Sequence, residues 1–446
     1  MTETFDAIVV GGGPSGATAA DDLARAGHKV LLLDRAGRIK PCGGAVPPRL
    51  LKDFEVPLSQ LCARATSARM IAPSHMAVDM TVGDGFVGLV DREVFDEFLR
   101  ARATSARMIA PSHKAVDMPV GDGFVGLVDR EVFDEFLRVR ATTNGAVRID
   151  GTFEDLVRDA DGTAVILYRP KGAARGSEPV RVRGKVVIGC DGGNSAVARA
   201  ALPANEKVPF VSAYHEVIES PPEGFNGFEG GRCDIYYQGH LSPDFYAWIF
   251  PHGDKTSVGV GSAVKGFEMR DAVARLRQQT GLDACKTIRV EGAPIPLKPR
   301  KRWDNGKDVV VAGDAAGVVA PASGEGIFYA MTAGRFAAEA AGVFLETGDP
   351  AALKAARKRF MKLHGQVFMV LGMMQWFWYR SDNMRERFVK LCQDPDIQQL
   401  TWEAYMNKEL VKKRPMAHLR VFVKDTRQLV GALFSGRKAD APSKAA

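Results

Sequence analysis

The chain has 446 residues, 46% of them hydrophobic and 25% charged, so it is long enough for two or three folded domains and too apolar for a disordered protein. Its formal net charge is +7, but the basic residues are spread along the chain without a nucleic-acid-binding motif, so nucleic acid is not an expected partner. No apolar run is long enough to cross a bilayer, and the N-terminus leads directly into a strand pattern and not into a signal peptide.

The six cysteines and eight histidines show neither a disulfide framework nor the spacing of metal ligands. We therefore expect a cytoplasmic protein without a metal site. The sequence leaves the oligomeric state open.

The first motif is a dinucleotide-binding βαβ unit. A strand pattern at 5–10 leads into Gly11-Gly12-Gly13-Pro14-Ser15-Gly16, a helix pattern at 17–26 and a strand pattern that ends on Asp34, next to Arg35. Gly11 permits the tight turn, Gly13 lets backbone N–H groups approach a pyrophosphate, and Gly16 lets the helix pack closely on the strand. The helix N-terminus favours phosphate, and the Asp34 carboxylate can accept hydrogen bonds from a ribose. This unit alone does not distinguish NAD from FAD.

A tandem duplication follows. Residues 63–100 and 101–138 are copies of 38 residues that differ at two places, Met76 against Lys114 and Thr81 against Pro119. Such near-identity indicates a recent duplication or an error in assembling the sequence. Each copy predicts a strand (RMIAPSH), a second strand (GFVGLV) and a helix (DREVFDEFLR). Only the second copy continues into a turn and a strand, at 142–149, so we expect its helix to occupy the native position and the first helix to be displaced or partly melted.

Two later glycine-acid clusters favour a flavin. A strand pattern at 182–190 ends in Asp191-Gly192-Gly193, and another at 308–312 ends in Gly313-Asp314. Gly324-Glu325-Gly326-Ile327 then opens a long helix. Asp314 can bond ribityl hydroxyls, and the backbone N–H groups at 324–326 can stabilise negative charge on a flavin ring. Together the three clusters predict FAD, with a catalytically inactive relative of the same fold as the alternative.

The resemblance to a family rests on these clusters and three further motifs. They are Pro41-Cys42-Gly43-Gly44, Pro243-x-x-Tyr246-x-Trp248-x-Phe250-Pro251, and Gly292-Ala293-Pro294-Ile295-Pro296-Leu297. The clusters resemble the para-hydroxybenzoate hydroxylase class of flavoproteins, and the added motifs resemble the geranylgeranyl reductases, above all those of chlorophyll and bacteriochlorophyll synthesis. The resemblance covers about residues 5–436 and departs at the duplication.

The resemblance implies an α/β fold with a Rossmann-like FAD-binding domain of the glutathione-reductase type, an inserted antiparallel β-sheet substrate domain and a C-terminal helical region. We expect the FAD-binding domain at 1–62, 120–205 and 300–345 with the duplication (63–138) inside it, the substrate domain at 206–299, the helical region at 346–436 and a disordered tail at 437–446.

The resemblance also implies chemistry. NADPH reduces tightly bound, non-covalent FAD, and the flavin passes hydride to isolated alkenes of a geranylgeranyl chain, on a pigment or on a diphosphate, to give phytyl. It places the arginine of R-x-x-F-D-x-x-L (Arg92 or Arg130) near the FAD phosphate and ribose, and Cys42 near the flavin. No second glycine fingerprint for NADPH is present.

Several assignments stay open. Tyr246, Trp248 and Phe250 alternate along a predicted strand, so they form either one wall of a lipid tunnel or an ordinary sheet core. Cys42 is either a proton donor, a pocket residue or a small buried hydrophobe, and the proton donor is unassigned. The apolar run at 367–379 lines the isoprenoid channel, enters a lipid interface or is buried.

The basic residues at 408–414 and 420–437 face either anionic lipid or water, so peripheral contact with a photosynthetic membrane is one alternative. The rival functions are a flavin-dependent monooxygenase and a non-catalytic prenyl-lipid-binding protein with a vestigial FAD site.

Overall fold

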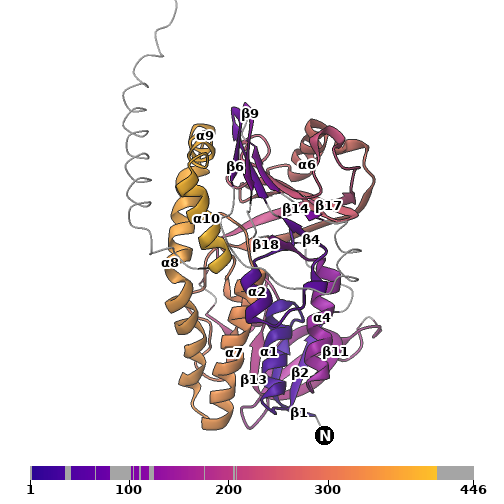
Figure 1. Ribbon diagram of the computed structural model, residues 1–446. Helices are drawn as coiled ribbons and strands as arrows, with labels where there is room; N and C mark the ends of the chain where they lie inside the picture. Colours follow the sequence, from indigo (N-terminus) through magenta and orange to yellow (C-terminus); the bar gives the residue numbers. More distant parts are fainter. Residues whose placement is uncertain are drawn as a thin grey trace, which may run out of the picture.

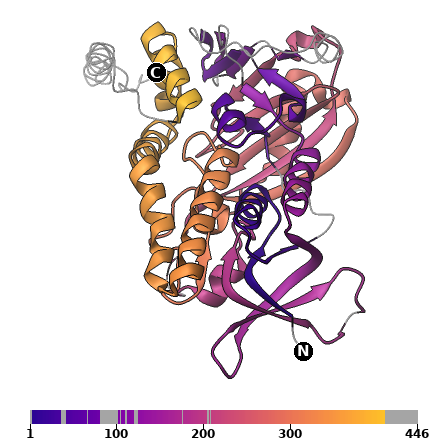
Figure 2. The same ribbon diagram turned by 60° about the horizontal axis from the view of Figure 1, so that its bottom comes forward.

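A computed structural model gives the fold and describes residues 3–35, 42–65, 67–80, 102–103, 105–109, 112–119, 125–174, 176–203, 206 and 208–408. Figure 1 shows two sheet regions, one holding β1, β2 and β13 and the other holding β14 and β17, with the long helix α8 along one side. Figure 2 shows the same arrangement from below, with α7 and α8 side by side.

The first region is a mainly parallel sheet with helices on both faces, and only β12 among its described strands runs antiparallel to its neighbours. Its described strands have the order β1-β2-β11-β12-β13-β19, with β1 also paired to β13. β1 is central, because Ala7 lies opposite Val30 of β2 and Val186 of β13, both in parallel. Its elements are β1 (Thr4–Val10), α1 (Pro14–Arg25), β2 (Val30–Asp34), α4 (Arg130–Thr143), β11 (Val147–Arg158), β12 (Ala164–Pro170), β13 (Val180–Gly189), α5 (Ala196–Ala201), β19 (Val309–Val311) and α7 (Ile327–Thr347).

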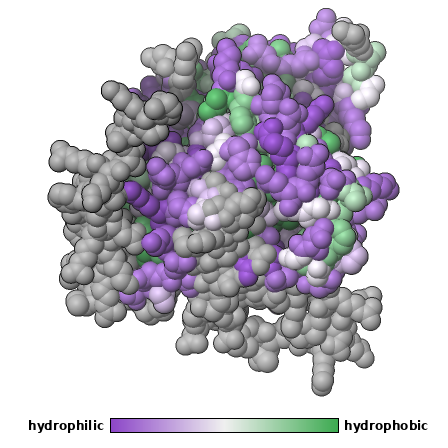
Figure 3. All heavy atoms as spheres, turned by 90° about the horizontal axis from the view of Figure 1, so that it is seen from above, coloured by the Kyte–Doolittle hydropathy of each residue, from purple (hydrophilic) through white to green (hydrophobic). Residues whose placement is uncertain are grey.

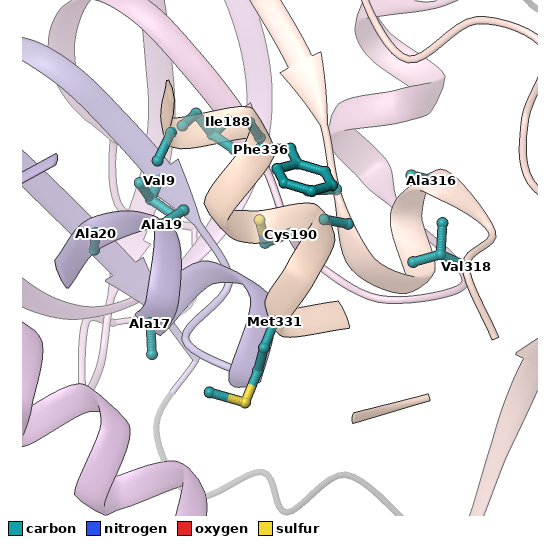
Figure 4. Close-up of a cluster of buried hydrophobic side chains, with 14 of the residues drawn as sticks. Val9, Ala17, Ala19, Ala20, Ile188, Cys190, Ala316, Val318, Met331 and Phe336 are labelled. Atoms are coloured by element: carbon teal, nitrogen blue, oxygen red, sulfur yellow. The ribbon is translucent and has the colours of Figure 1, made fainter. Parts of the chain in front are cut away.

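The side chains of β1 alternate between two cores, as the two-residue period of a strand requires. Val9 points toward the core under α1 and α7, whereas Ile8 points toward the core on the opposite face. Figure 4 shows Val9, Ile188, Met331 and Phe336, from β1, β13 and α7, as members of this buried cluster. A strand buried on both faces must be apolar at every position, which explains the run of aliphatic residues before the glycine loop.

The second region is a large mixed sheet with the described order β18-β14-β17-β16-β15-β5-β6-β9-β8. Its strands are β5 (Ser67–Pro73), β6 (His75–Met80), β8 (Ser105–Ile109), β9 (Ser112–Pro119), β14 (Phe210–Glu219), β15 (Arg232–Tyr236), β16 (Ala247–His252), β17 (Lys255–Ser262) and β18 (Thr287–Pro296), with helix α6 (Met269–Thr280). A small sheet joins the two regions through β3 (Ala45–Val46), β4 (Ala63–Ala65), β7 (Arg102–Ala103) and β10 (Val125–Leu127), next to α2 (Pro48–Asp53).

The duplication contributes to both sheet regions: its longer strands lie in the second sheet, and the helix of its second copy, α4, packs on the nucleotide-binding unit. Strands from both copies extend the second sheet, and β15 is parallel to β5, so this sheet is not purely antiparallel. Cys233 of β15 lies opposite Ala68 of the first copy and also opposite Ala106, the equivalent residue of the second. Identical sequences present identical pairing edges, which is why both copies reach the same strand. The segments HMAVDM and SHKAVDMP form β6 and β9, which were not predicted as strands.

The second copy supplies the helix that packs on the nucleotide-binding unit, as expected. Asp129 caps α4 by accepting a hydrogen bond from the N–H of Glu131 at 2.9 Å, and Phe133 and Leu137 are fully buried. Two residues after the second copy hold this helix: Arg140 Nε lies 3.1 Å from Asp21, and Asn144 donates to the same carboxylate at 2.6 Å. At the position equivalent to Asn144, the first copy is followed by Ala106. The helix of the first copy, with Arg92, falls outside the described residues.

After α7 the described chain is mainly helical, with α8 (Lys354–Trp378), α9 (Asp382–Leu391) and α10 (Pro395–Asn407). Among the described residues, no helix has both the length and the apolar character needed to cross a bilayer. Seen from the end that carries the second sheet, the described surface is mostly hydrophilic with scattered apolar spots (Figure 3). The predicted tail at 437–446 lies outside the described residues.

Candidate active site

The glycine loop after β1 has the geometry of a pyrophosphate cradle. Gly11 has a φ of +103°, and a methyl group there would lie 2.4 Å from the carbonyl oxygen of Cys190. A methyl group at Gly16 would lie 1.8 Å from the carbonyl oxygen of Gly11. At Gly13, however, a methyl group would meet no protein atom within 4 Å. Gly11 and Gly16 are therefore required by the fold, whereas the space beside Gly13 is open to a ligand.

Asp34 at the end of β2 is joined to this loop. Its carboxylate accepts a hydrogen bond from the N–H of Gly12 at 2.9 Å, and Arg138 of α4 lies 3.3 Å from its other oxygen. Arg138 also donates to the carbonyl of Gly12 at 3.2 Å. This arginine was not predicted from the sequence, because only the packing of α4 on α1 brings it to the acid. Arg35, the next residue after Asp34, is exposed.

The other two glycine-acid clusters converge on the same loop. A methyl group at Gly11 would lie 2.9 Å from the Cα of Asp191, and one at Gly313 would lie 2.8 Å from the Cβ of Ser15. Ser15 Oγ is also 3.5 Å from the sulfur of Cys190. Three segments far apart in the sequence therefore meet at the start of α1, as the FAD prediction requires. Asp314, next to Gly313, is buried there.

Asp191 has a structural task that the sequence did not suggest. Its carboxylate accepts hydrogen bonds from Ser195 Oγ at 2.5 Å, from the N–H of Ala196 at 2.6 Å and from the N–H of Val197 at 3.1 Å. It thereby caps the first turn of α5. Its backbone lies beside the glycine loop, but its side chain is committed to the helix.

Arg130 and Cys42 are neighbours. Arg130 is buried and forms a bidentate ion pair with Asp134, with both N···O distances at 2.7 Å. Burial acts to lower the pKa of Arg130, but Asp134 and then Cys42 raise it overall, so the guanidinium stays charged next to the sulfur. Cys42 Sγ also accepts the N–H of Gly44 at 3.3 Å. The arginine of the repeat thus lies against the Cys42 loop.

The three aromatic residues form one row, as their alternation predicted. The ring centroids of Tyr246 and Trp248 are 6.0 Å apart, and those of Trp248 and Phe250 are 6.2 Å apart. All three are at most 9% exposed and belong to the core of the second sheet. The row is therefore packed into the core of the second sheet.

The row joins two loops of the site. At one end the phenol of Tyr246 lies against the loop before α7, because a methyl group at Gly324 would be 3.1 Å from its oxygen. At the other end a methyl group at Gly43 would be 2.8 Å from the Phe250 ring. α7 begins at Ile327, directly after Gly326. The aromatic row thus spans from the Cys42 loop to the N-terminus of α7, where the sequence placed the flavin ring.

Lys408 does not face lipid or water. It is 3% exposed, and its Nζ lies 3.0 Å from Glu325, whose other oxygen accepts the N–H of Phe328 at 3.1 Å. The basic residues beyond Lys408 lie outside the described residues. Among those described, no group of His, Cys, Asp and Glu has the arrangement of a metal site.

These residues fit FAD. The glycine cradle is open at Gly13, the first turn of α1 carries no acidic side chain that would repel phosphate, and three glycine-bearing loops meet around one space. The adenosine and pyrophosphate would lie along Gly11–Gly16 and Asp34, and the ring near Gly324 and Gly326.

Comparison with known proteins agrees with this geometry. Residues 92–363 match the family described as "FAD binding domain", and residues 9–58 match "NAD(P)-binding Rossmann-like domain". A geranylgeranyl diphosphate reductase from Rhodobacter capsulatus is 50% identical over 96% of this chain and 98% of its own length. The chain belongs to the geranylgeranyl diphosphate reductase family. A second member, from Synechocystis, is 32% identical over 96% of this chain and 97% of its own.

Solved structures support the fold class. A geranylgeranyl bacteriochlorophyll reductase-like protein from Thermoplasma acidophilum superposes with a TM-score of 0.73 at 21% identity, covering 93% of this chain and 99% of its own. A flavin-dependent brominase superposes with a TM-score of 0.64 at 15% identity, covering 95% of this chain and 100% of its own. At these identities the likeness concerns the fold alone. The predicted fold, a Rossmann-like FAD-binding domain with a second sheet domain and C-terminal helices, is confirmed.

Proposed function

We propose that this chain is an FAD-dependent reductase that uses NADPH to saturate isolated C=C bonds of a geranylgeranyl chain. The observation that carries the proposal is the aromatic row, which begins at the loop before α7 and ends at the Cys42 loop. FAD, when bound, takes a hydride from NADPH and passes it to the alkene. The protein must then hold an uncharged alkene by shape and apolar contact and must supply a proton.

The family relationship supports the same activity, because the most similar relatives reported above are geranylgeranyl diphosphate reductases along nearly their whole length. A monooxygenase would share the three glycine-acid clusters, since these serve only the coenzyme. Its chemistry would require oxygen, whereas alkene reduction requires none.

The experiment is an anaerobic incubation of purified, FAD-loaded protein with NADPH and geranylgeranyl diphosphate, analysed by mass spectrometry. We expect products heavier by two, four and six hydrogen atoms than the substrate. If the substrate is not reduced under anaerobic conditions but gains an oxygen atom when oxygen is present, the protein is a monooxygenase. Prenyl-lipid binding without flavin turnover would identify the non-catalytic alternative. A parallel incubation with geranylgeranyl bacteriochlorophyll compares the pigment-bound and diphosphate forms.

We further propose that helix α8 contacts a membrane surface. Met369, Met373 and Trp376 are 59%, 55% and 71% exposed, and their spacing puts them on one face of the helix. Lys362 lies on the same face near one end, and Arg380 follows the other end of the helix, with its guanidinium 5.5 Å from the Trp376 ring centroid. An apolar stripe between two cations suits the interface of an anionic bilayer, where a prenylated substrate resides.

The test is co-sedimentation with phosphatidylglycerol-containing vesicles. The double variant Met373→Ser/Trp376→Ser should lose most of the binding. The control Val132→Ser removes a residue that is 57% exposed on α4 and should bind as the wild type does. Equal binding by both variants would contradict contact through α8.

A further inference from the structure

A row of side chains crosses the second sheet from the aromatic wall to its edge. Trp248 of β16 lies opposite Gly259 of β17, Gly259 lies opposite His215 of β14, and His215 lies opposite Glu291 of β18. A methyl group at Gly259 would lie 2.2 Å from the Trp248 ring and 2.5 Å from the Cβ of His215. The glycine therefore lets the two rings approach, and their centroids are 6.2 Å apart.

Polar contacts connect the members of this row. The indole N–H of Trp248 donates to Ser257 Oγ at 3.1 Å, and Ser257 Oγ lies 2.9 Å from His215 Nδ1. On the other side of the ring, His215 Nε2 lies 2.9 Å from Glu291 Oε2. The Ser257 hydroxyl can donate to Nδ1 when His215 is neutral and accept from it when His215 is charged. The site can therefore hold both protonation states of the imidazole.

The row borders a small cavity that also reaches Cys42. The cavity has a volume of about 30 Å³, which is room for about two water molecules, and is lined by residues including Cys42, Arg130, His215, Ser257 and Glu291. His215 Nε2 is buried 2.9 Å from Glu291 Oε2, and both residues line the cavity. Its N–H is thus placed to share a proton with a group in the cavity as well as with the carboxylate.

The outer side of the cavity leads toward solvent. Lys255 and Arg289 line it there and have side chains 33% and 26% exposed. The charged and titratable groups that line the cavity around His215 are Glu291, Arg289, Lys255, His252, Asp129, Arg130 and Cys42. Burial raises the pKa of Glu291, but its contacts with His215 and then Arg289 lower it overall, so the carboxylate stays ionised and attracts a proton to His215.

We propose that His215, supported by Glu291 and Ser257, supplies the proton for alkene reduction through this cavity to Cys42. This inference rests on the proposed reductase activity. Each saturated C=C bond gains one hydride, which carries the electron pair, and one proton. In the proton step the S–H bond of Cys42 breaks and a C–H bond forms on the substrate. The thiolate, stabilised by Arg130, then regains a proton from the His215 imidazolium through water, and His215 is reprotonated from solvent.

The test separates proton supply from the rest of the cycle. His215→Gln protein is reduced by NADPH without oxygen, and its reoxidation by geranylgeranyl diphosphate is followed by flavin absorbance. We expect reduction by NADPH at the wild-type rate and reoxidation slowed about a hundredfold. The wild-type reoxidation rate should fall as pH rises, because neutral imidazole supplies no proton, and the variant should lose this dependence. His240→Gln, the same substitution at a histidine outside the cavity, should leave both rates unchanged.

Two further results complete the test. If His215→Gln protein fails to take up FAD, the variant Ser257→Ala is tested in its place. Its reoxidation should be about tenfold slower than that of the wild type and should lose the dependence on pH. Wild-type reoxidation and pH dependence in a variant with a full complement of FAD would overturn the proton path. Wild-type protein that is not reoxidised by the substrate at all would instead overturn the reductase activity.

Discussion

The phenol of Tyr246 donates a hydrogen bond to the backbone carbonyl of Ser323, with an O···O distance of 2.6 Å. The neighbouring carbonyl, that of Ala322, accepts the phenol of Tyr379 at 2.9 Å. Ala322 has a φ of +61°, a conformation that costs a residue with a side chain about 1 kcal/mol. Two tyrosines from distant elements thus hold the strained loop that leads into α7.

Tyr246→Phe should loosen this loop. The Ser323 carbonyl would lose its donor, which costs about 1–3 kcal/mol of unfolding free energy, and FAD should bind more weakly because the loop borders its expected ring site. Urea unfolding and titration with FAD measure the two effects. The control Tyr214→Phe removes a phenol that bonds Glu216 at 3.1 Å, away from the loop, and should leave FAD affinity unchanged. Unaltered FAD affinity in Tyr246→Phe would contradict this role.

Gly13→Ala should separate folding from FAD binding. Gly13 has a φ of −73°, which alanine adopts readily, and its added methyl group would touch no protein atom. The free energy of unfolding of the apoprotein should therefore lie within about 0.5 kcal/mol of the wild-type value. FAD binding should be lost, because the methyl group fills the space through which the phosphate approaches the backbone. Gly16→Ala, by contrast, should fail to fold, since its methyl group would overlap the Gly11 carbonyl. Circular dichroism and flavin absorbance distinguish these outcomes, and a yellow Gly13→Ala protein would disprove the cradle.

The buried pair Lys408–Glu325 should couple the C-terminal helix to the loop before α7. Lys408→Met alone would leave the Glu325 carboxylate buried without its cation and should cost about 3–5 kcal/mol. Lys408→Met/Glu325→Gln should recover much of that loss, because no unpaired charge remains. Chemical denaturation of the two single variants and the double variant gives the coupling energy. Additive losses would show that the pair is not coupled.

The stability of the protein should fall as pH decreases from about 6.5. Burial lowers the pKa of His252 below its usual range, so between that lower pKa and about 6.5 the unfolded chain binds a proton that the folded chain does not. Protons therefore favour unfolding in this window. His252→Asn should flatten the dependence of melting temperature on pH between about 7 and 5. If the melting temperature changes with pH equally in the variant and the wild type, groups other than His252 cause the loss of stability.

The nucleotide-binding unit could be predicted almost completely from the sequence. Gly11, Gly13, Gly16 and Asp34 act through neighbours within one βαβ unit, and their spacing alone brings them together. The alternation of Tyr246, Trp248 and Phe250 likewise required one face, because a strand repeats every two residues. These relationships are short-range, so periodicity and turn chemistry were sufficient.

Other parts of the site were not visible in the sequence. Arg138 reaches Asp34, Asp191 caps α5, and Lys408 turns inward to Glu325. Asp191 was predicted to bind the cofactor, and Lys408 was predicted to face lipid or water, so the sequence pointed away from these contacts. The His215–Glu291 contact was missed because it depends on the register of β14 against β18.

The sequence by itself therefore determined the local chemistry of this protein: a glycine cradle, a ribose acid, an aromatic row and two identical 38-residue copies. It also predicted that the second copy packs on the cradle, because only this copy continues into the turn and strand at 142–149. Only the tertiary structure showed what holds that helix: Arg140 and Asn144 both bind Asp21 of the distant helix α1, and Ala106 stands after the first copy where Asn144 stands after the second. Contacts across such distances follow from how sheets and helices pack, and spacing along the chain does not contain that information.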